Sequence, residues 1–389
     1  MSEAQKRLPD EVKKYRLGKF YLGQMDLFYF FFHLALDIGK KNSQVAFITT
    51  SYYTTARGAR KLRQDFKDRA VVNNLINFNE LKIFRAAQGQ HNMITILTKD
   101  YDPSSLAKNS ITKRLGVAKP EILSSILNWN DDSNDYFNVS QQDLYDGGEN
   151  YIRLEGKGSL ENNNPTQNIL SKIQSAGIPL EVLCNVNVGL YTGADKVTEA
   201  YLRKYSLQNS DKGAGIFIIS SEEKQDLNLN EFEKEKVVPF FKNSDIDKVY
   251  TRTVCNQFLI NISYPDCKNL KLSQIPNLYK HIQKFEKVLK GRKSNDNGLQ
   301  SVIKKGYWWS FTIRQIDFNQ PKIVSPQRSK VNTFGYNEIP WYASADVYFI
   351  TQKDKNISLK YILASLNSKL YFYWLCHRGK RKGETLELY

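Results

Sequence analysis

Apolar residues near the start of the chain recur at helical spacing. Between Asp26 and Ile38 they fall three and four residues apart, which predicts a packed helix that Gly39 is placed to end. A polar turn then leads to residues 44–50, a short β-favouring run of the kind buried in a parallel sheet. The helix face expected to pack consists of Leu27, Phe30, Phe31, Leu34, Ala35 and Ile38.

The next segments extend this alternation of helices and strands. Residues 55–69 read as a helix, and residues 71–78 and 93–97 read as strands, of which the last pair could be antiparallel. This order resembles the second half of an α/β sheet domain, because parallel strands need helical crossovers. No Gly-rich turn between a strand and a helix occurs nearby, so the half that usually cradles a cofactor is expected to be missing.

A change in composition divides the rest of the chain. Residues 101–165 are acidic and polar, which indicates a connector with some helix and no core of its own. The turn-rich stretch 161–165 places the boundary between two predicted domains, 1–165 and 166–389. The second domain is expected to be α+β, with strands at 181–188, 215–219, 322–324 and 346–350 and helices at 276–292 and 359–376.

The overall composition is that of a folded protein. Of the 389 residues, 41% are hydrophobic and 25% are charged. The longest apolar run, 27–38, is interrupted by His33 and Asp37 and is too short to span a membrane. The first 20 residues are charged throughout, which argues against a secretory signal. The four cysteines form no Cys-x-x-Cys pair, so we expect no disulfide framework, no zinc site and a cytoplasmic location.

Positive charge is concentrated at both ends of the chain. The formal net charge is +16. Residues 1–100 carry 17 Lys and Arg against 9 Asp and Glu, and residues 251–389 carry 23 against 9, whereas residues 101–250 carry 16 against 22. Two basic surfaces beside an acidic middle indicate a polyanionic partner, with nucleic acid ahead of an acidic membrane surface. For any single lysine, an ordinary solvated surface position remains the alternative.

The loop between the strands at 71–78 and 93–97 carries the first candidate site. Phe84 offers a stacking face there, and Gln90, His91 and Asn92 offer hydrogen bonds to a base, as at the lip of a pocket. The alternative, which composition alone favours, is a tight connection with Phe84 in the core and His91 satisfied locally.

Cations and aromatic residues interleave in the C-terminal part. Lys and Arg neutralise phosphates, Arg and Gln reach base edges, and Trp can stack, so this mixture suits DNA binding. The candidate DNA-binding residues are Lys304, Lys305, Trp308, Arg314, Gln327, Arg328, Lys330, Arg378, Lys380 and Arg381. The alternatives are that Trp308 and Trp309 are half core and half surface, and that residues 378–383 form a solvated tail. No metal site is predicted.

Several segments resemble a known family. Residues 26–31, 45–49 and 84–97 resemble the later motifs of the gamma-class adenine-N6 DNA methyltransferases, in the branch fused into type IIG restriction-modification enzymes. Segments of the second half are similar to the target-recognition domain of that family: 189–196, 240–246, 321–329 and 366–370. The resemblance implies the second half of a Rossmann-like methyltransferase sheet followed by an α+β target-recognition domain.

The resemblance also implies a function in phage defence or restriction-modification. Such enzymes transfer a methyl group from S-adenosylmethionine to a flipped-out adenine, and by position Phe84 matches the aromatic that stacks on that base. The family's Asn-Pro-Pro-Tyr motif is absent, and residues 163–166 do not replace it. We therefore expect no catalytic residues, no tight cofactor binding and no methyl transfer by this chain alone.

The expected partners follow from this resemblance. They are double-stranded DNA and either the missing N-terminal half or a separate catalytic subunit, with no membrane. The chain is then either part of a methyltransferase or a stand-alone DNA-binding specificity subunit that works with another chain. A basic RNA-binding protein is a weaker alternative, because no RNP, KH or OB pattern appears.

Overall fold

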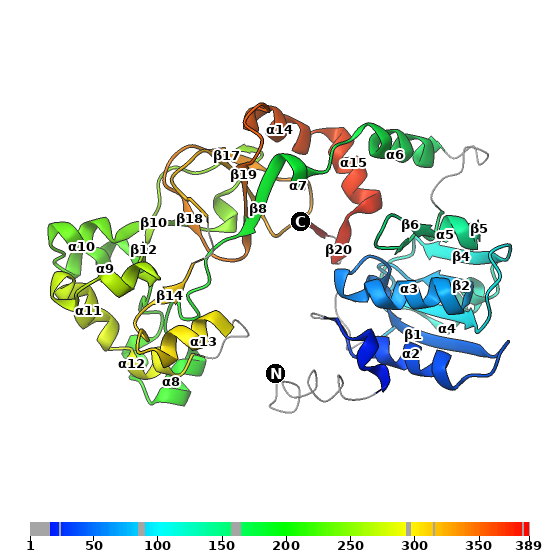
Figure 1. Ribbon diagram of the computed structural model, residues 1–389, viewed down its shortest axis with the longest axis horizontal. Coiled ribbons are helices and arrows are strands. Elements are labelled where there is room, and N and C mark those ends of the chain that lie inside the picture. The colour runs from blue at the N-terminus through cyan, green and yellow to red at the C-terminus, as the bar shows by residue number, and fades with distance from the viewer. Residues whose placement is uncertain are drawn as a thin grey trace. The chain divides into compact units, whose positions relative to one another are not determined.

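The computed structural model of the chain contains two compact units. It describes residues 16–22, 25–84, 90–156, 165–292, 297–313, 316–382 and 385–388. Unit 1 comprises Met1–Gly177 with Arg378–Thr385, and unit 2 comprises Ile178–His377 with Leu386–Tyr389 (Figure 1). The compact units thus divide after Gly177. The turn-rich stretch placed the boundary of the functional domains at 165/166, and that boundary stays a prediction.

Unit 1 is built on one five-stranded sheet. The strand order is β1-β3-β2-β4-β5, in which β2 and β4 are parallel and the other neighbours are antiparallel. Helices α2 and α3 pack on this sheet through a shared apolar core (Figure 1). The elements are η1 (Arg16–Phe20), α2 (Phe28–Ile38), β1 (Gln44–Thr50), η2 (Ser51–Thr54), η3 (Arg57–Ala59), α3 (Arg60–Arg69), β2 (Val71–Asn77), β3 (Asn92–Thr98), β4 (Leu106–Thr112), α4 (Pro120–Leu127), β5 (Asn134–Ser140), α5 (Gln141–Leu144), β6 (Tyr145–Asp146), β7 (Tyr151–Ile152) and α6 (Pro165–Ala176).

The sequence predicted the first elements of unit 1 well but missed two strands of its main sheet. The first helices and strands lie where the hydrophobic pattern placed them, and β2 and β3 are antiparallel. The expectation that residues 101–165 form only a connector was wrong, because β4 and β5 complete the sheet. The sequence of β1 predicted a strand buried in a parallel sheet. In the structure, β1 instead pairs antiparallel with β3 at the edge of the sheet.

Helix α2 turns the opposite face to the core from the one we predicted. Tyr29, Phe32, His33 and Leu36 are buried, whereas Phe31 is 60% exposed. The helix is apolar on nearly all sides, so periodicity alone did not decide which side packs. The exposed apolar positions beside α2 and along it are Leu27, Phe31, Leu34 and Ile38.

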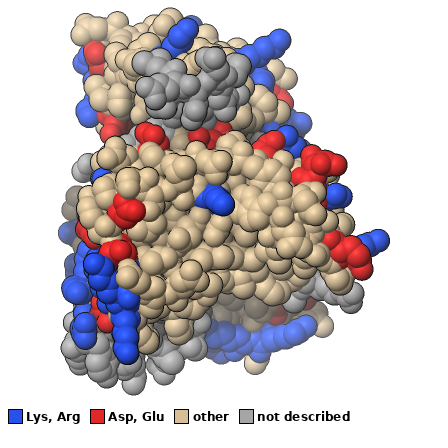
Figure 2. All heavy atoms as spheres, turned by 90° about the vertical axis from the view of Figure 1, so that its right-hand side faces the viewer, with Lys and Arg blue, Asp and Glu red and all other residues tan. Residues whose placement is uncertain are grey.

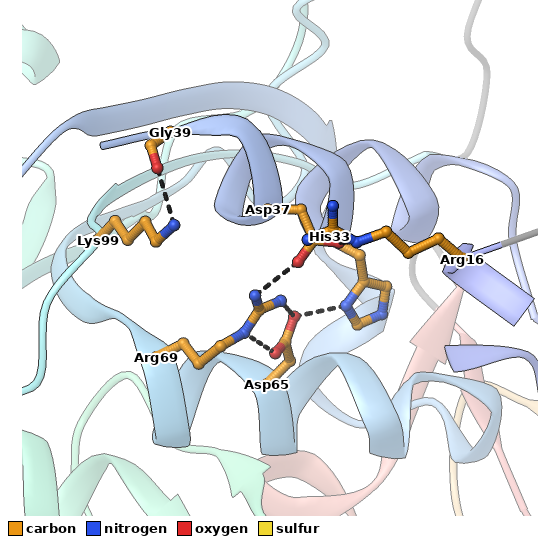
Figure 3. Close-up of polar contacts among 7 residues, drawn as sticks. All are labelled: Arg16, His33, Asp37, Gly39, Asp65, Arg69 and Lys99. Atoms are coloured by element: carbon orange, nitrogen blue, oxygen red, sulfur yellow. Dashed lines mark hydrogen bonds and ion pairs between the residues drawn. The ribbon is translucent and has the colours of Figure 1, made fainter. Parts of the chain in front are cut away.

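A buried ion-pair network joins α2 to α3 (Figure 3). His33 Nδ1 lies 2.6 Å from Asp65 Oδ2, and Arg69 binds both oxygens of Asp65. Arg69 also donates to Asp37 of α2 at 2.7 Å, and Phe20 stacks on the His33 ring. Burial raises the pKa of Asp65, but hydrogen bonds from His33 and Arg69 outweigh it and hold that pKa below its usual range. The network therefore fixes the register of the two helices.

Unit 2 contains two larger sheets, further short strand pairs and several short helices. The sheets have the strand orders β18-β10-β12-β9 and β11-β17-β15-β19-β8. Their apolar faces join one large core that includes Phe217, Phe311 and Trp341. The helices are α7 (Leu180–Leu183), α8 (Glu199–Tyr205), η4 (Asn209–Asp211), α9 (Ser221–Asp226), α10 (Glu231–Glu235), η5 (Asn243–Asp245), η6 (Asp266–Asn269), η7 (Leu272–Gln274), α11 (Pro276–Gln283), α12 (Glu286–Lys290), α13 (Asn297–Lys304), α14 (Leu359–Leu366) and α15 (Lys369–Arg378).

The strands after residue 183 are short and irregular, and of these β20 lies wholly and β21 partly in unit 1. They are β8 (Cys184–Val188), β9 (Ile218–Ser220), β10 (Val237–Phe241), β11 (Val249–Tyr250), β12 (Gln257–Ile260), β13 (Ser263–Tyr264), β14 (Phe311–Thr312), β15 (Lys322–Pro326), β16 (Arg328–Ser329), β17 (Gly335–Asn337), β18 (Tyr342–Ala343), β19 (Val347–Gln352), β20 (Lys380–Lys382) and β21 (Thr385–Glu387). The predicted strand at 181–188 is helical at its start, and the predicted helices 276–292 and 359–376 are each divided into two. None of the described helices is long and apolar enough to cross a membrane.

A buried guanidinium stabilises unit 1 without a carboxylate partner among the described residues. Arg63 is fully buried and donates to the carbonyl oxygens of Tyr53, Ala56 and Glu149 at 2.8, 2.7 and 3.0 Å. Burial lowers the pKa of Arg63 to about 10, so it stays charged at neutral pH.

We expect Arg63→Met to destabilise unit 1 by at least about 3 kcal/mol, because it leaves carbonyl groups without their donor. Hydrogen exchange of β1, β2 and β3 amides measures this free energy for unit 1 alone. The matched control is Arg60→Met on the same helix, whose exposed ion pair with Glu149 should contribute less than about 1 kcal/mol. Equal effects of the two substitutions would contradict the assignment.

Candidate nucleic-acid interface

A polar hollow in unit 2 is formed where separate family-like segments meet. It encloses about 320 Å³. The segments 189–196 and 240–246 both contribute, and Gln327 of the segment 321–329 donates its N–H to the carbonyl oxygen of Asp346 at 2.7 Å. The hollow is lined by Asp195, Lys196, Ile218, Phe240, Lys242, Asn243, Gln257, Ser344 and Asp346. Hydrogen-bond donors and acceptors therefore stand side by side, as the reading of base edges requires.

Two carboxyl groups at the hollow are oriented by neighbouring hydroxyl groups. Thr192 donates to Asp195, and Ser344 donates to Asp346. Burial raises the pKa of Asp195, and the charge of Asp346 raises it further. The hollow therefore presents acceptors whose positions are fixed before any ligand binds.

The loop that carries Asp195 needs its glycines. A side chain at Gly189 would overlap the carbonyl oxygens of Ala343 and Ser344, so the strand β18 can approach closely only because no Cβ is present. Gly193 has a φ of +74°, a left-handed conformation that other residues adopt with strain. Its missing Cβ also leaves room for Arg292 and Leu299.

Arg292 joins this loop to the aromatic segment 307–312. Its guanidinium donates to the carbonyl oxygens of Thr192, Trp308 and Ser310 at 2.6, 2.6 and 2.8 Å. Burial lowers the pKa of Arg292 to about 10, which leaves it charged at neutral pH. The sequence placed this residue only at the end of a predicted helix, and no signal in the sequence pointed to its role.

Exposed cations precede the aromatic segment, and one of its rings reaches the surface. Lys304 and Lys305 are exposed at the end of α13. Trp308 is half-buried with Lys290 Nζ 5.5 Å from its ring, whereas Trp309 lies in the core. The tandem tryptophans thus divide into one core and one surface residue, which was the alternative reading of this pair. The DNA contacts of Lys304, Lys305 and Trp308 stay predictions.

The remaining predicted contacts of the second half have different environments. Gln327 is half-buried, Lys330 is exposed, and Arg328 is 45% exposed with its Nε 3.3 Å from Glu387. Arg378 belongs to unit 1 and is half-buried, so burial lowers its pKa to about 10. Arg314 and the side chains of Lys380 and Arg381 lie outside the described residues.

The predicted pocket lip of unit 1 is only partly at the surface. Phe84 is 46% exposed and not in the core, and Gln90 is exposed. His91 and Asn92 are buried, and His91 Nε2 lies 3.0 Å from Glu80, so the contacts of these two residues with a base stay a prediction. The local interaction of His91 is the alternative that composition favoured. Nowhere in the described ranges do three or more His, Cys, Asp or Glu residues gather to hold a metal ion.

Comparison with known protein families gives two matches. Residues 2–84 match the family described as Eco57I restriction-modification methylase, and residues 202–388 match the TaqI-like C-terminal specificity domain. The hollow and the aromatic segment belong largely to the second match. The chain therefore combines a methylase-like segment with a TaqI-like specificity domain.

Named relatives extend over the whole chain. The type II methyltransferase M.HindII of Haemophilus influenzae is 23% identical over 100% of this chain and 69% of its own length. M.BstVI of Geobacillus stearothermophilus is 23% identical over 98% of this chain and 63% of its own length. The chain is thus homologous to type II methyltransferases and shorter than these relatives.

One solved structure shares the fold. The type IIL restriction-modification enzyme MmeI, determined in complex with DNA, aligns with a TM-score of 0.56 at 15% identity. The alignment covers 100% of this chain and 43% of MmeI. The arrangement of α/β elements described above therefore recurs in a known restriction-modification enzyme.

We expect Gly193→Ala to cost more stability than Gly213→Ala. Both glycines have positive φ, but a Cβ at Gly193 would also lie 3.1 Å from Leu299 and 3.2 Å from Arg292, whereas nothing lies within 4 Å of one at Gly213. The control substitution should cost about 1 kcal/mol from backbone strain, and Gly193→Ala about 1 kcal/mol more. Urea unfolding of the two variants measures the difference, and equal midpoints would show that Arg292 and Leu299 are free to move.

Proposed function

We propose that this chain supplies sequence-specific DNA recognition to an adenine-N6 DNA methyltransferase of a restriction-modification system, of the type IIG branch that acts in phage defence. The observation that carries the proposal is the junction at Arg292, which holds a polar hollow next to a surface of cations and aromatic rings. Such a combination provides base reading and phosphate contacts together. The TaqI-like match covers most of this surface, which supports the same function.

We place S-adenosylmethionine binding outside this chain. The end of β1 would be the natural place for a cofactor in an α/β sheet. Tyr53 follows β1 there, is fully buried, and its hydroxyl group lies 2.6 Å from that of Thr95, so its ring packs inside unit 1, which supports placing the cofactor in a further segment. The parent enzyme would then bind the cofactor through a further methyltransferase segment, and Phe84 would stack on the flipped adenine at the exposed surface of this one.

Selection from a pool of random duplex DNA at two salt concentrations tests recognition. We expect an enriched motif that contains adenine, because the hollow offers fixed donors and acceptors to base edges. Arg328→Ala should relax one base position by about 1 to 3 kcal/mol, since its exposed guanidinium can leave Glu387 for a guanine.

The matched control for this test is Arg252→Ala. Arg252 is also exposed and paired with a carboxylate, Asp245, so it reports the loss of one surface charge. Salt-dependent binding without an enriched motif would contradict the proposed function. Equal losses on all sequences for Arg328→Ala would contradict its role as a base-reading residue.

We infer in addition that α2 and β1 form the docking surface for the further methyltransferase segment. Among the described strands, none pairs with the second edge of β1, and Ile48 on this strand is exposed. Helix α2 contacts β1 and exposes Phe31 and Ile38, the latter at 75%. An apolar stripe beside an unpaired strand fits a neighbouring α/β segment, which adds both a strand and a covering layer.

Figure 2 shows, on the side of Figure 1 where unit 1 lies, a broad area with few charged side chains and with acidic and basic groups toward its margin. The chain spans 63% of M.BstVI, so that relative carries sequence beyond the part matched here. The segment would come from the same polypeptide or from a separate chain.

When this chain and the further methyltransferase segment are produced as separate polypeptides, Phe31→Asp should abolish their co-purification, because a carboxylate would be buried at the interface. The control is Tyr361→Asp, which places the same charge at an equally exposed aromatic residue of α14. Retention of the complex by Phe31→Asp would exclude this docking surface.

A further inference from the structure

We propose that Tyr264, Lys268 and Lys305 form a binding site for one backbone phosphate of duplex DNA. This assignment rests on the proposed function and deepens it, because it names the chemical group that the surface holds. Lys268 and Tyr264 were not among the residues that the sequence pointed to. The site would bind the two non-bridging oxygens of a phosphodiester, and it would not distinguish one base sequence from another.

The three side chains come from two parts of unit 2 that are distant in sequence. Tyr264 ends β13, Lys268 lies on η6, and Lys305 follows α13. The ammonium nitrogens of Lys268 and Lys305 lie 4.9 and 5.8 Å from the centre of the Tyr264 ring. Two cations that are distant in sequence therefore converge on one phenol.

The fold holds these residues in place. Strand β13 pairs in parallel with β14, so Tyr264 lies opposite Thr312. The Tyr307 ring contacts the Tyr264 ring edge-on with 5.7 Å between the ring centres. Arg292 in turn holds the segment that carries Tyr307, through the carbonyl oxygens of Trp308 and Ser310. The site is thus anchored to the same junction as the polar hollow.

Neither lysine has an acidic partner in the part of the chain that the structure describes. Other exposed lysines of unit 2 form ion pairs, such as Lys212 with Glu199 and Lys234 with Glu231, both at 2.6 Å. No carboxylate of a described residue lies within 4.0 Å of the Lys268 or Lys305 nitrogen. Two ammonium groups beside one phenol repel each other, and an anion bound between them would offset that repulsion.

The electrostatics of the phenol agree with this geometry. A hydrogen bond from Lys268 lowers the pKa of Tyr264, and the charge of Lys305 lowers it further. The same hydrogen bond raises the pKa of Lys268. The field at the phenol oxygen is therefore positive, and a bound phosphate would oppose it and raise the pKa of Tyr264 again.

A DNA phosphate fits this surface better than an acidic protein segment. Lys304 lies next to Lys305 in the chain, and Lys290 lies over the half-buried Trp308 of the same aromatic segment. A surface with cations at several positions matches a polymer with evenly spaced charges, about one for every 1.7 Å of duplex. The aromatic rings between them suit contacts with sugars and bases.

The first experiment measures the salt dependence of binding to a fixed duplex. Each phosphate that the protein neutralises adds about 0.9 to the slope of log K against log salt concentration. We expect Lys268→Gln with Lys305→Gln to lower the slope by about one in total and to weaken binding about tenfold on every sequence. Lys212→Gln, which removes an equally exposed but paired charge, is the control and should change neither.

Two results of this experiment would overturn the assignment. If the double variant retains the slope and affinity of the Lys212→Gln control, the lysines do not contact phosphate. If the slope falls by about two, the lysines serve separate phosphates and share no site. In both cases an enriched recognition motif would leave the proposed function standing.

The second experiment needs no DNA. The ring carbons of [¹³C]tyrosine-labelled protein report the pKa of Tyr264, whose signal is assigned with Tyr264→Phe. Inorganic phosphate should raise this pKa in the wild type and leave it unchanged in Lys268→Gln with Lys305→Gln. A response to phosphate in a chain that does not bind DNA would uphold the anion site and reject the proposed function, and the absence of any response would reject the site.

Discussion

The arrangement of unit 2 depends on the hydrogen bonds of one buried guanidinium. Arg292 binds the carbonyl oxygens of Thr192, Trp308 and Ser310, which come from segments about a hundred residues apart in the chain. A guanidinium carries five N–H donors in a fixed plane, so it can hold several carbonyl groups in one geometry. The polar hollow and the basic aromatic surface are positioned together by this interaction.

In unit 1, the buried guanidinium of Arg63 likewise donates hydrogen bonds to several backbone carbonyl oxygens. In both cases the donors bind backbone carbonyls, and burial lowers the pKa of the guanidinium without discharging it at neutral pH. A buried charge without a counter-ion is costly, so these positions are stable only while every carbonyl stays in place. Each guanidinium therefore makes its surroundings rigid as a group. A rigid surface loses less conformational entropy when it binds a ligand.

The hydrophobic pattern predicted the local elements of unit 1 but not how they face one another. Residues 28–38 form the expected helix, yet its buried side is the one with Tyr29 and His33, because Asp65 of α3 binds His33. Strand β4 escaped prediction because its sequence, Leu106–Thr112, is largely polar and its place is fixed by pairing with β2. Pairing between distant segments leaves no periodic trace in the sequence.

For the candidate site too, the sequence indicated some of the residues and only the structure indicated the others. The sequence identified Lys305 and Trp308 from their composition alone, since cations and aromatic rings stand next to each other there. It did not identify Arg292, Tyr264 or Lys268, whose importance comes from contacts across the fold. It assigned His91 to a pocket lip, whereas Glu80 lies close enough to bind it in the folded chain. Composition indicates candidate binding residues, and only the fold shows which side chains converge.

The unpaired edge of β1 has a consequence for how the protein is handled in a cell. The strand Gln44–Thr50 contains no charged residue, proline or glycine, which are the usual means of keeping an open strand from joining its own copies. Among the described residues no strand pairs with this edge, and the apolar side of α2 lies beside it, so the edge would be a template for aggregation in a chain without the proposed docking partner. Matched synthesis of this chain and the proposed partner segment, or their fusion into one polypeptide, would remove that hazard.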